Sequence, residues 1–160
     1  MGIQTKDIHP DGLDPSVIQG LVADPWRRKI YVSSTHAQAV DRLNSGLSPK
    51  SPLKTLKWWS DHKKESGDLI LVGAGHVETL DVANEVNIPS TLNDVAIIGL
   101  GSGDRRPKFT VGSVGNSDTA ADFMISGPGT FLKNLRFVCG LDSLVAMINC
   151  SAADCGFEDL

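Results

Sequence analysis

NDVAI at residues 93–97 is the segment that best indicates the architecture, because a similar segment returns twice further along the chain. It returns as KNLRF at residues 133–137 and as EDL at residues 158–160. The aliphatic residues at the third position of the three stretches are Val95, Leu135 and Leu160, which are 40 and 25 residues apart. Self-similarity at a regular spacing is typical of repeat architectures, so it outweighs local secondary-structure preferences.

A second set of aliphatic residues gives nearly the same spacing. Ile88, Ile125 and Ile148 are 37 and 23 residues apart. Both sets agree on a period of about 24 residues, with about 15 extra residues in the middle interval. We therefore predict one insertion at about 99–121, a region rich in glycine, serine and aspartate.

From residue 67 onward, short apolar runs alternate with glycine, proline, asparagine, aspartate or serine, which is typical of β-strands. The strands we expect are 68–72, 86–88, 95–98, 109–111, 123–125, 130–138, 144–148 and 155–160. An antiparallel sandwich would also have short strands, but it does not explain why two sets of anchors share one spacing. We predict an all-β fold in which residues 68–160 form a parallel β-helix of about four coils, each coil burying its inward side chains on the next.

Residues 1–29 are expected to form an extended N-terminal arm. They contain three Xaa-Pro pairs, and proline disfavours the helical conformation of the residue before it. Because they offer few apolar side chains, we predict an arm that becomes ordered on another surface, with a free tail as the alternative.

Residues 30–67 are expected to hold a first strand, which begins at Lys29, and then a capping helix. Ser51 suits the N-cap and Pro52 the first helical position, while Gly67 is placed to end the helix. Trp58 and Trp59 lie side by side on this helix and need a large surface to cover. The helix packs either on the first coil or on an ordinary core.

The chain has 160 residues and a formal net charge of −4, which suits one domain and offers no electrostatic attraction to a nucleic-acid backbone. No apolar run approaches the roughly 18 residues that cross a bilayer. The first residues lack the apolar segment of a signal peptide. Cys139, Cys150 and Cys155 lack paired spacing, so we predict reduced thiols in the interior and folding in a reducing cytoplasm. We expect neither nucleic acid nor membrane as a partner.

Few side chains suggest chemistry. The main concentration of charge consists of Asp94, Asp104, Arg105, Arg106, Asp118 and Asp122. A solvated loop or docking surface is favoured over catalysis for this group, since no Asp-Asp pair occurs.

The histidines give no stronger signal. His76 and Glu78 are two residues apart, which places them on one face of a strand, as an acid–base pair or as part of a structural turn. His9, His36 and His62 share no metal-ligand spacing with His76, with each other or with the cysteines. We therefore predict no catalytic residue, no metal site and no cofactor.

Several segments resemble the pectate-lyase-like superfamily of right-handed, single-stranded parallel β-helix proteins. The resemblance begins with IYVSS at 30–34, NSGLSP at 44–49 and SPLKTL at 51–56. The segments that resemble members from tailed bacteriophages and prophages are GDLILV at 67–72, GHVET at 75–79, NLRFV at 134–138 and AAD at 152–154. The resemblance covers residues 30–160.

The resemblance implies that the helix closes the open apolar end of the first coil. It also implies a non-enzymatic virion structural protein, either a capsid-decoration or head-associated protein or a tail-spike-type component, made in the bacterial cytoplasm. Such proteins are commonly homotrimers, and residues 1–29 would contact other capsid or tail proteins. The alternative is a glycan-binding or polysaccharide-cleaving module, a lyase or hydrolase, that holds host surface sugars on a coil face near residues 104–106.

Overall fold

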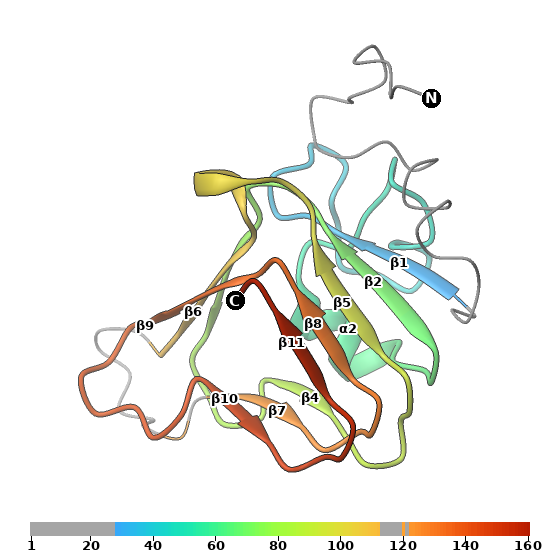
Figure 1. Ribbon diagram of the computed structural model, residues 1–160. Helices are drawn as coiled ribbons and strands as arrows, with labels where there is room; N and C mark the ends of the chain where they lie inside the picture. Colours follow the sequence, from blue (N-terminus) through green and yellow to red (C-terminus); the bar gives the residue numbers. More distant parts are fainter. Residues whose placement is uncertain (1–27, 113–119, 121) are drawn as a thin grey trace, which may run out of the picture.

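The structure is a computed structural model that describes residues 28–112, 120 and 122–160 (Figure 1). Most of the predicted arm, together with residues 113–119 and 121 of the predicted insertion, lies outside the described residues. The first five elements of the described residues are β1 (Arg28–Val32), α2 (Leu56–His62), β2 (Asp68–Val72), β3 (Val77–Leu80) and β4 (Val86–Ile88). They are followed by β5 (Ala96–Gly99), the short 3-10 helix η2 (Gly103–Arg105), β6 (Lys108–Val111), β7 (Phe123–Ile125), β8 (Phe131–Lys133), β9 (Arg136–Cys139), β10 (Ile148–Cys150) and β11 (Gly156–Glu158).

The strands form three parallel sheets, and from β2 onward each sheet receives every third strand. The sheets are β1-β2-β5-β8-β11, β4-β7-β10 and β3-β6-β9. They form three sides around a shared interior (Figure 1). All eight strand pairings among the described residues are parallel, so the antiparallel sandwich is wrong and the all-β prediction is confirmed.

Inward-facing side chains stack in ladders across the sheets. The longest ladder, read across the five-stranded sheet, is Ile30, Ile70, Ile97, Leu132 and Phe157. Its first four members are fully buried in one apolar cluster, where aliphatic side chains of neighbouring strands pack about 4.8 Å apart. A second ladder places the rings of Phe109 and Phe137 5.6 Å apart. This removal of apolar surface from water is the main driving force for stacking the strands.

The registers confirm one anchor of each predicted repeat and correct the other. Strand β11 lies 25 residues after β8, which is the predicted spacing of Leu135 and Leu160, and Ile88 pairs with Ile125 as predicted. Strand β8 lies 35 residues after β5, so the 40-residue match of Val95 with Leu135 is wrong. Ile148 pairs with Phe123 instead of Ile125, so that spacing is wrong by two residues.

The wrong match has a clear physical origin. Asp94 and Asn134 both adopt the left-handed conformation, with φ of 55° and 54°, which asparagine and aspartate tolerate better than most residues. Asp94 lies two residues before β5, whereas Asn134 follows β8 directly. The two similar sequence stretches therefore mark turns at opposite ends of equivalent strands.

Several predicted strands also need correction. The single run 130–138 is two strands, β8 and β9, because the turn at Asn134 divides it. The run 144–148 contributes only its last residue to β10. Strand β3 was missed because its outward residues are exposed and its inward Glu78 is charged.

The predicted helix boundaries are wrong at both ends. Thr55 is the N-cap and accepts a hydrogen bond from the Trp58 amide, so the N-cap lies four residues after Ser51 and the helix begins at Leu56. Ser51 and Pro52 instead lie beside Leu53, which exchanges backbone hydrogen bonds with β1. The helix ends at His62, and Gly67, with φ of 78°, forms the turn into β2.

The residues before β2, together with α2, cover the first strand of every sheet. The Tyr31 amide of β1 donates to the Gly46 carbonyl, and the Tyr31 carbonyl accepts from the Leu53 amide. The Ser60 hydroxyl accepts from the Asn87 amide of β4 at 2.8 Å and lies 3.2 Å from the Asn87 carbonyl. The Ser34 hydroxyl accepts from the Val77 amide of β3. These bonds occupy backbone groups that a sheet edge would otherwise leave unpaired.

Asp68 joins β1, β2 and α2 from a fully buried position. It accepts a bidentate pair from Arg28, with both N···O distances 2.8 Å, and a third bond from the Trp59 indole at 2.8 Å. The Glu65 amide donates a fourth bond at 3.0 Å. The hydrogen bond to Asp68 raises the pKa of Arg28, while burial and then the charge of Arg28 lower the pKa of Lys63. The carboxylate thus balances a cation and holds Trp59 in the core.

We expect Asp68→Asn to lower the free energy of unfolding by about 2–3 kcal/mol, because it removes the fully buried carboxylate that pairs with Arg28 and leaves the guanidinium only the exposed Glu65. The matched control is Asp61→Asn, which removes an exposed ion pair with Lys57 on the outer side of α2 and should cost no more than about 0.5 kcal/mol. Urea unfolding followed by tryptophan fluorescence measures both. Equal losses in the two variants would show that the buried pair has no special weight.

Candidate functional site

The most enclosed polar pair among the described residues is His76 and Glu78. The His76 side chain is fully buried and the Glu78 side chain is 5% exposed. The His76 Nε2 atom lies 3.0 Å from Glu78 Oε2. The two residues flank the start of β3, and the Phe109 ring of β6 lies 5.4 Å from the imidazole.

The hydrogen bonds around the pair assign its protonation state. The Ser34 amide donates to His76 Nδ1 at 2.9 Å, so this nitrogen carries no proton. The proton is therefore on Nε2, which donates to the Glu78 carboxylate. Both nitrogens of the imidazole are therefore occupied by hydrogen bonds.

The Glu78 carboxylate is equally occupied, because it caps the N-terminus of α2. Its Oε2 accepts from the Leu56 amide at 2.7 Å and its Oε1 from the Lys57 amide at 2.9 Å. These are orphan donors of the first helical turn, where a negative charge is also favoured by the helix dipole. The pair therefore acts by holding α2 against β3, and it offers no solvent-facing group to a substrate.

A second carboxylate completes the start of the helix. Asp41 Oδ1 accepts from the Lys54 and Thr55 amides, and Asp41 Oδ2 accepts from the Thr55 hydroxyl at 2.9 Å. Two acidic side chains distant in sequence thus fix where α2 begins. A local capping motif does not contain them, which explains why the sequence pattern placed the helix too early.

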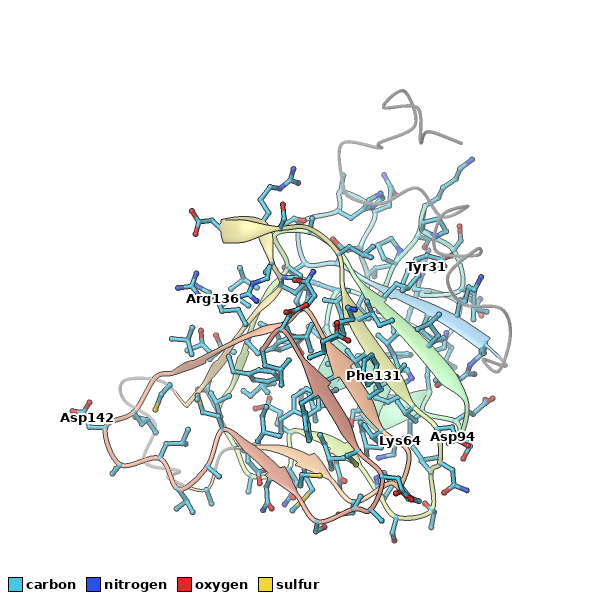
Figure 2. All side chains as sticks on the ribbon, viewed as in Figure 1. Tyr31, Lys64, Asp94, Phe131, Arg136 and Asp142 are labelled. Atoms are coloured by element: carbon cyan, nitrogen blue, oxygen red, sulfur yellow. The ribbon has the colours of Figure 1, made fainter. Side chains whose placement is uncertain are left out.

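The predicted concentration of charge is dispersed by the fold. Asp94 and the η2 residues Asp104 and Arg105 lie at opposite ends of β5 (Figures 1 and 2). Arg106 donates to the Asp159 carbonyl at 3.0 Å. Asp122 is buried before β7 and accepts from the Asn84 amide at 2.7 Å, while Asp118 lies outside the described residues. Asp94, Asp104 and Asp122 therefore do not form the single charged cluster that the sequence suggested.

The other histidines have separate local roles, and His9 lies outside the described residues. His36 accepts from the Gln38 amide, and the His62 ring stacks on Trp58 with centroids 4.5 Å apart. Within the described part of the chain, no group of three or more histidine, cysteine, aspartate or glutamate side chains could hold a metal ion.

The prediction that the cysteines lie in the interior is wrong. Cys139 and Cys150 are exposed and Cys155 is half-buried, all with free thiols. Cys139 lies in β9, Cys150 in β10 and Cys155 directly before β11. Each of these strands is the last of its sheet, so among the described residues no further strand pairs with its outer edge. Burial, followed by a bond to the Cys150 thiol, raises the pKa of Cys155.

One surface feature was missed by the sequence analysis. Lys108 and Arg136 face outward at paired positions of β6 and β9. Lys108 follows Arg106 by two residues. Figure 2 shows Arg136 projecting away from the interior. Basic residues 28 positions apart cannot be recognised as neighbours before the register is known.

Comparison of the chain with protein-family models, with curated proteins and with solved structures gives no match. Among the described residues, none of the helices has the length and apolar character needed to cross a bilayer.

We expect Glu78→Gln to destabilise the protein by about 1–3 kcal/mol, because the amide can satisfy only part of the three bonds that the carboxylate accepts. Glu158→Gln is the control, since it removes an exposed ion pair with Lys133 and should leave stability nearly unchanged. Thermal unfolding measures both. A Glu78→Gln protein as stable as the control would contradict the capping role.

Proposed function

We propose that the three sheets are the faces of a right-handed, single-stranded parallel β-helix of about four coils. Support comes from the regular order in which β2-β3-β4, β5-β6-β7 and β8-β9-β10 each supply one strand to every sheet. Parallel strands joined by a crossover connection are almost always right-handed, because strand twist favours that hand. The unequal intervals between equivalent strands fit coils that differ only in the lengths of their turns.

We further propose that this β-helix is a non-enzymatic structural protein of a bacteriophage virion. Its place would be a capsid-decoration or head-associated position or a tail-spike-type component, with synthesis in the bacterial cytoplasm. Residues 1–29 would dock on other capsid or tail proteins, and the chain would form a homo-oligomer, a trimer in the pattern of the proteins that it resembles. This part of the proposal rests on analogy at the level of the fold.

The observation that carries the proposal is the closure of the stack at its first strands. The buried polar side chains there, Asp68, His76 and Glu78, are all bonded to backbone or to one another in ways that hold the fold. Buried polar side chains whose hydrogen bonds stabilise the fold suit a structural protein rather than an enzyme.

Purified particles provide the test. We expect mass spectrometry of washed virions from the producing strain to detect the chain in constant ratio to a major capsid or tail protein. Particles from a strain with the gene inactivated are the control and should bind added full-length chain. An excess of a synthetic peptide of residues 1–29 should block that binding, whereas a scrambled peptide should not. Absence of the chain from washed particles would contradict the virion role, and binding that ignores the peptide would contradict docking through the arm.

A second candidate function follows from the basic residues on β6 and β9. Lys108 and Arg136 are adjacent in register, and Arg105 and Arg106 precede β6 in the turn from β5. Arginine and lysine side chains bind carboxylate or sulfate groups, so this face suits an anionic polysaccharide. Such a surface would support glycan binding, or glycan cleavage by a lyase or hydrolase. It lies near residues 104–106, where the sequence analysis places the alternative sugar-binding site.

This candidate predicts retention on immobilised acidic polysaccharide at low salt. Arg136→Gln should weaken binding by about tenfold, or roughly 1.4 kcal/mol, because it interrupts the pair with Lys108. Lys50→Gln, in the exposed turn before α2, removes the same charge elsewhere and should leave binding unchanged. Equal effects of both variants would indicate non-specific charge attraction, and absence of retention at about 50 mM salt would remove the candidate.

A further inference from the structure

The outer face of the five-stranded sheet carries an unusual strip of apolar side chains. Along β1, β2, β5 and β8 the residues that alternate with the inward ladder point away from the interior. The members of this outer strip are Tyr31, Leu69, Leu71, Ala96, Ile98, Leu100 and Phe131. Figure 2 marks Tyr31 on β1 and Phe131 on β8, toward the two sides of the strip.

The centre of the outer strip is shielded from water although it lies outside the core. Leu69 and Ala96 are fully buried and Leu71 is 3% exposed. By contrast, Val77, an outward residue of the neighbouring β3, is 50% exposed. An outward leucine therefore needs a cover that the outer face of β3 does not have.

The apolar side chains that pack against these three residues lie in the same layer as they do. Tyr31 and Ile98 pair with Leu71 from the two strands beside β2, and Phe131 pairs with Ala96, so all three lie within the same layer of side chains. Side chains in one layer stand side by side about 4.8 Å apart, and they shield the flanks of their neighbours more than the tops. A second layer must lie over the strip.

Residues 1–27 have the right position and length to provide this layer. They lead directly into Arg28, the first residue of β1, at the edge of the strip. The strip is about 14 Å wide from β1 to β8 at about 4.8 Å per strand, a distance that a handful of extended residues spans at about 3.3 Å each. The other segment outside the described residues, 113–121 apart from 120, follows β6 in a different sheet.

The composition of residues 1–27 fits the strip as well. Within the stretch 15–22, Val17, Ile18, Leu21 and Val22 recur at the spacing of one helical face. The segment holds two basic and four acidic residues, for a net charge of −2. Lys29, an outward residue in line with the strip, provides an opposite charge, whereas Lys133 is already paired with Glu158. Exposed apolar patches of this extent are rare on soluble proteins, which also favours a cover supplied by the chain itself.

We propose that residues 1–27 fold back in cis and pack the apolar side of 15–22 on Leu69 and Leu71. The arm thereby completes a second, smaller apolar layer on the outside of the five-stranded sheet. This inference does not depend on the virion proposal. If the arm docks on a partner through the same apolar side, it must first leave this sheet, and the outer strip then becomes exposed.

Photo-cross-linking of the full-length chain tests the proposal. We expect a benzophenone amino acid in place of Tyr31 to form an intramolecular cross-link to a peptide within residues 1–27, in a protein that remains monomeric on the gel. The same amino acid in place of Thr79, an exposed outward residue of β3, should give no such cross-link. A covalent dimer from position 31, or no cross-link from it at all, would overturn the proposal.

A matched pair of substitutions identifies the contact. Leu71→Asp should reduce the intramolecular cross-link from position 31 at least tenfold, whereas Val77→Asp, the equivalent change on the outer face of β3, should leave it unchanged. If Leu71→Asp fails to fold by circular dichroism, Ile18→Asp makes the same test from the arm and leaves the sheets untouched. An undiminished cross-link in Ile18→Asp would overturn packing through 15–22. The particle assay described above reports separately on the virion proposal.

Discussion

The fold depends on one buried carboxylate, that of Asp68. It lies at the start of β2, and its four hydrogen bonds reach Arg28 of β1, the indole of Trp59 in α2 and the backbone of Glu65. A carboxylate without such partners would be too costly to bury, so burial of Asp68 requires β1, β2 and α2 to be in place together. This requirement couples the segment before β2 to the sheets and draws Trp59 over the interior.

That coupling also solves the problem that a stack of parallel strands has at its first end. Each sheet there would present a row of unpaired backbone groups, a template for unwanted association. The backbone of Gly46 and Leu53 and the hydroxyls of Ser34 and Ser60 contact these edges instead. Strands β9, β10 and β11 have a partner strand on one side only, so the two ends of the described stack differ. The first end is covered by residues of the chain itself. The other end presents three strands with half-buried apolar side chains between them.

The polar residues that the sequence analysis singled out, His76 and Glu78, stabilise this fold. His76 and Glu78 look like a catalytic pair in the sequence, yet their hydrogen-bonding atoms are taken up by the Ser34 amide and by the first turn of α2. The surface holds the features that remain for recognition. These are the basic residues paired across β6 and β9, and the outer strip next to β1 that we assign to residues 1–27.

The positions of β2, β4 and β7 could be read from the sequence, because short apolar runs bounded by turn residues carry that information locally. The adjacent tryptophans also indicated that Trp59 would need a large surface to cover. The register was settled only by the folded chain, since Asp94 and Asn134 have the same backbone conformation at opposite strand ends and local similarity cannot tell the ends apart. The folded chain likewise decided the start of α2 and the environment of the cysteines. The caps Asp41 and Glu78 are brought to the helix by contacts distant in sequence, and the burial of a thiol depends on whether another strand stacks beyond it.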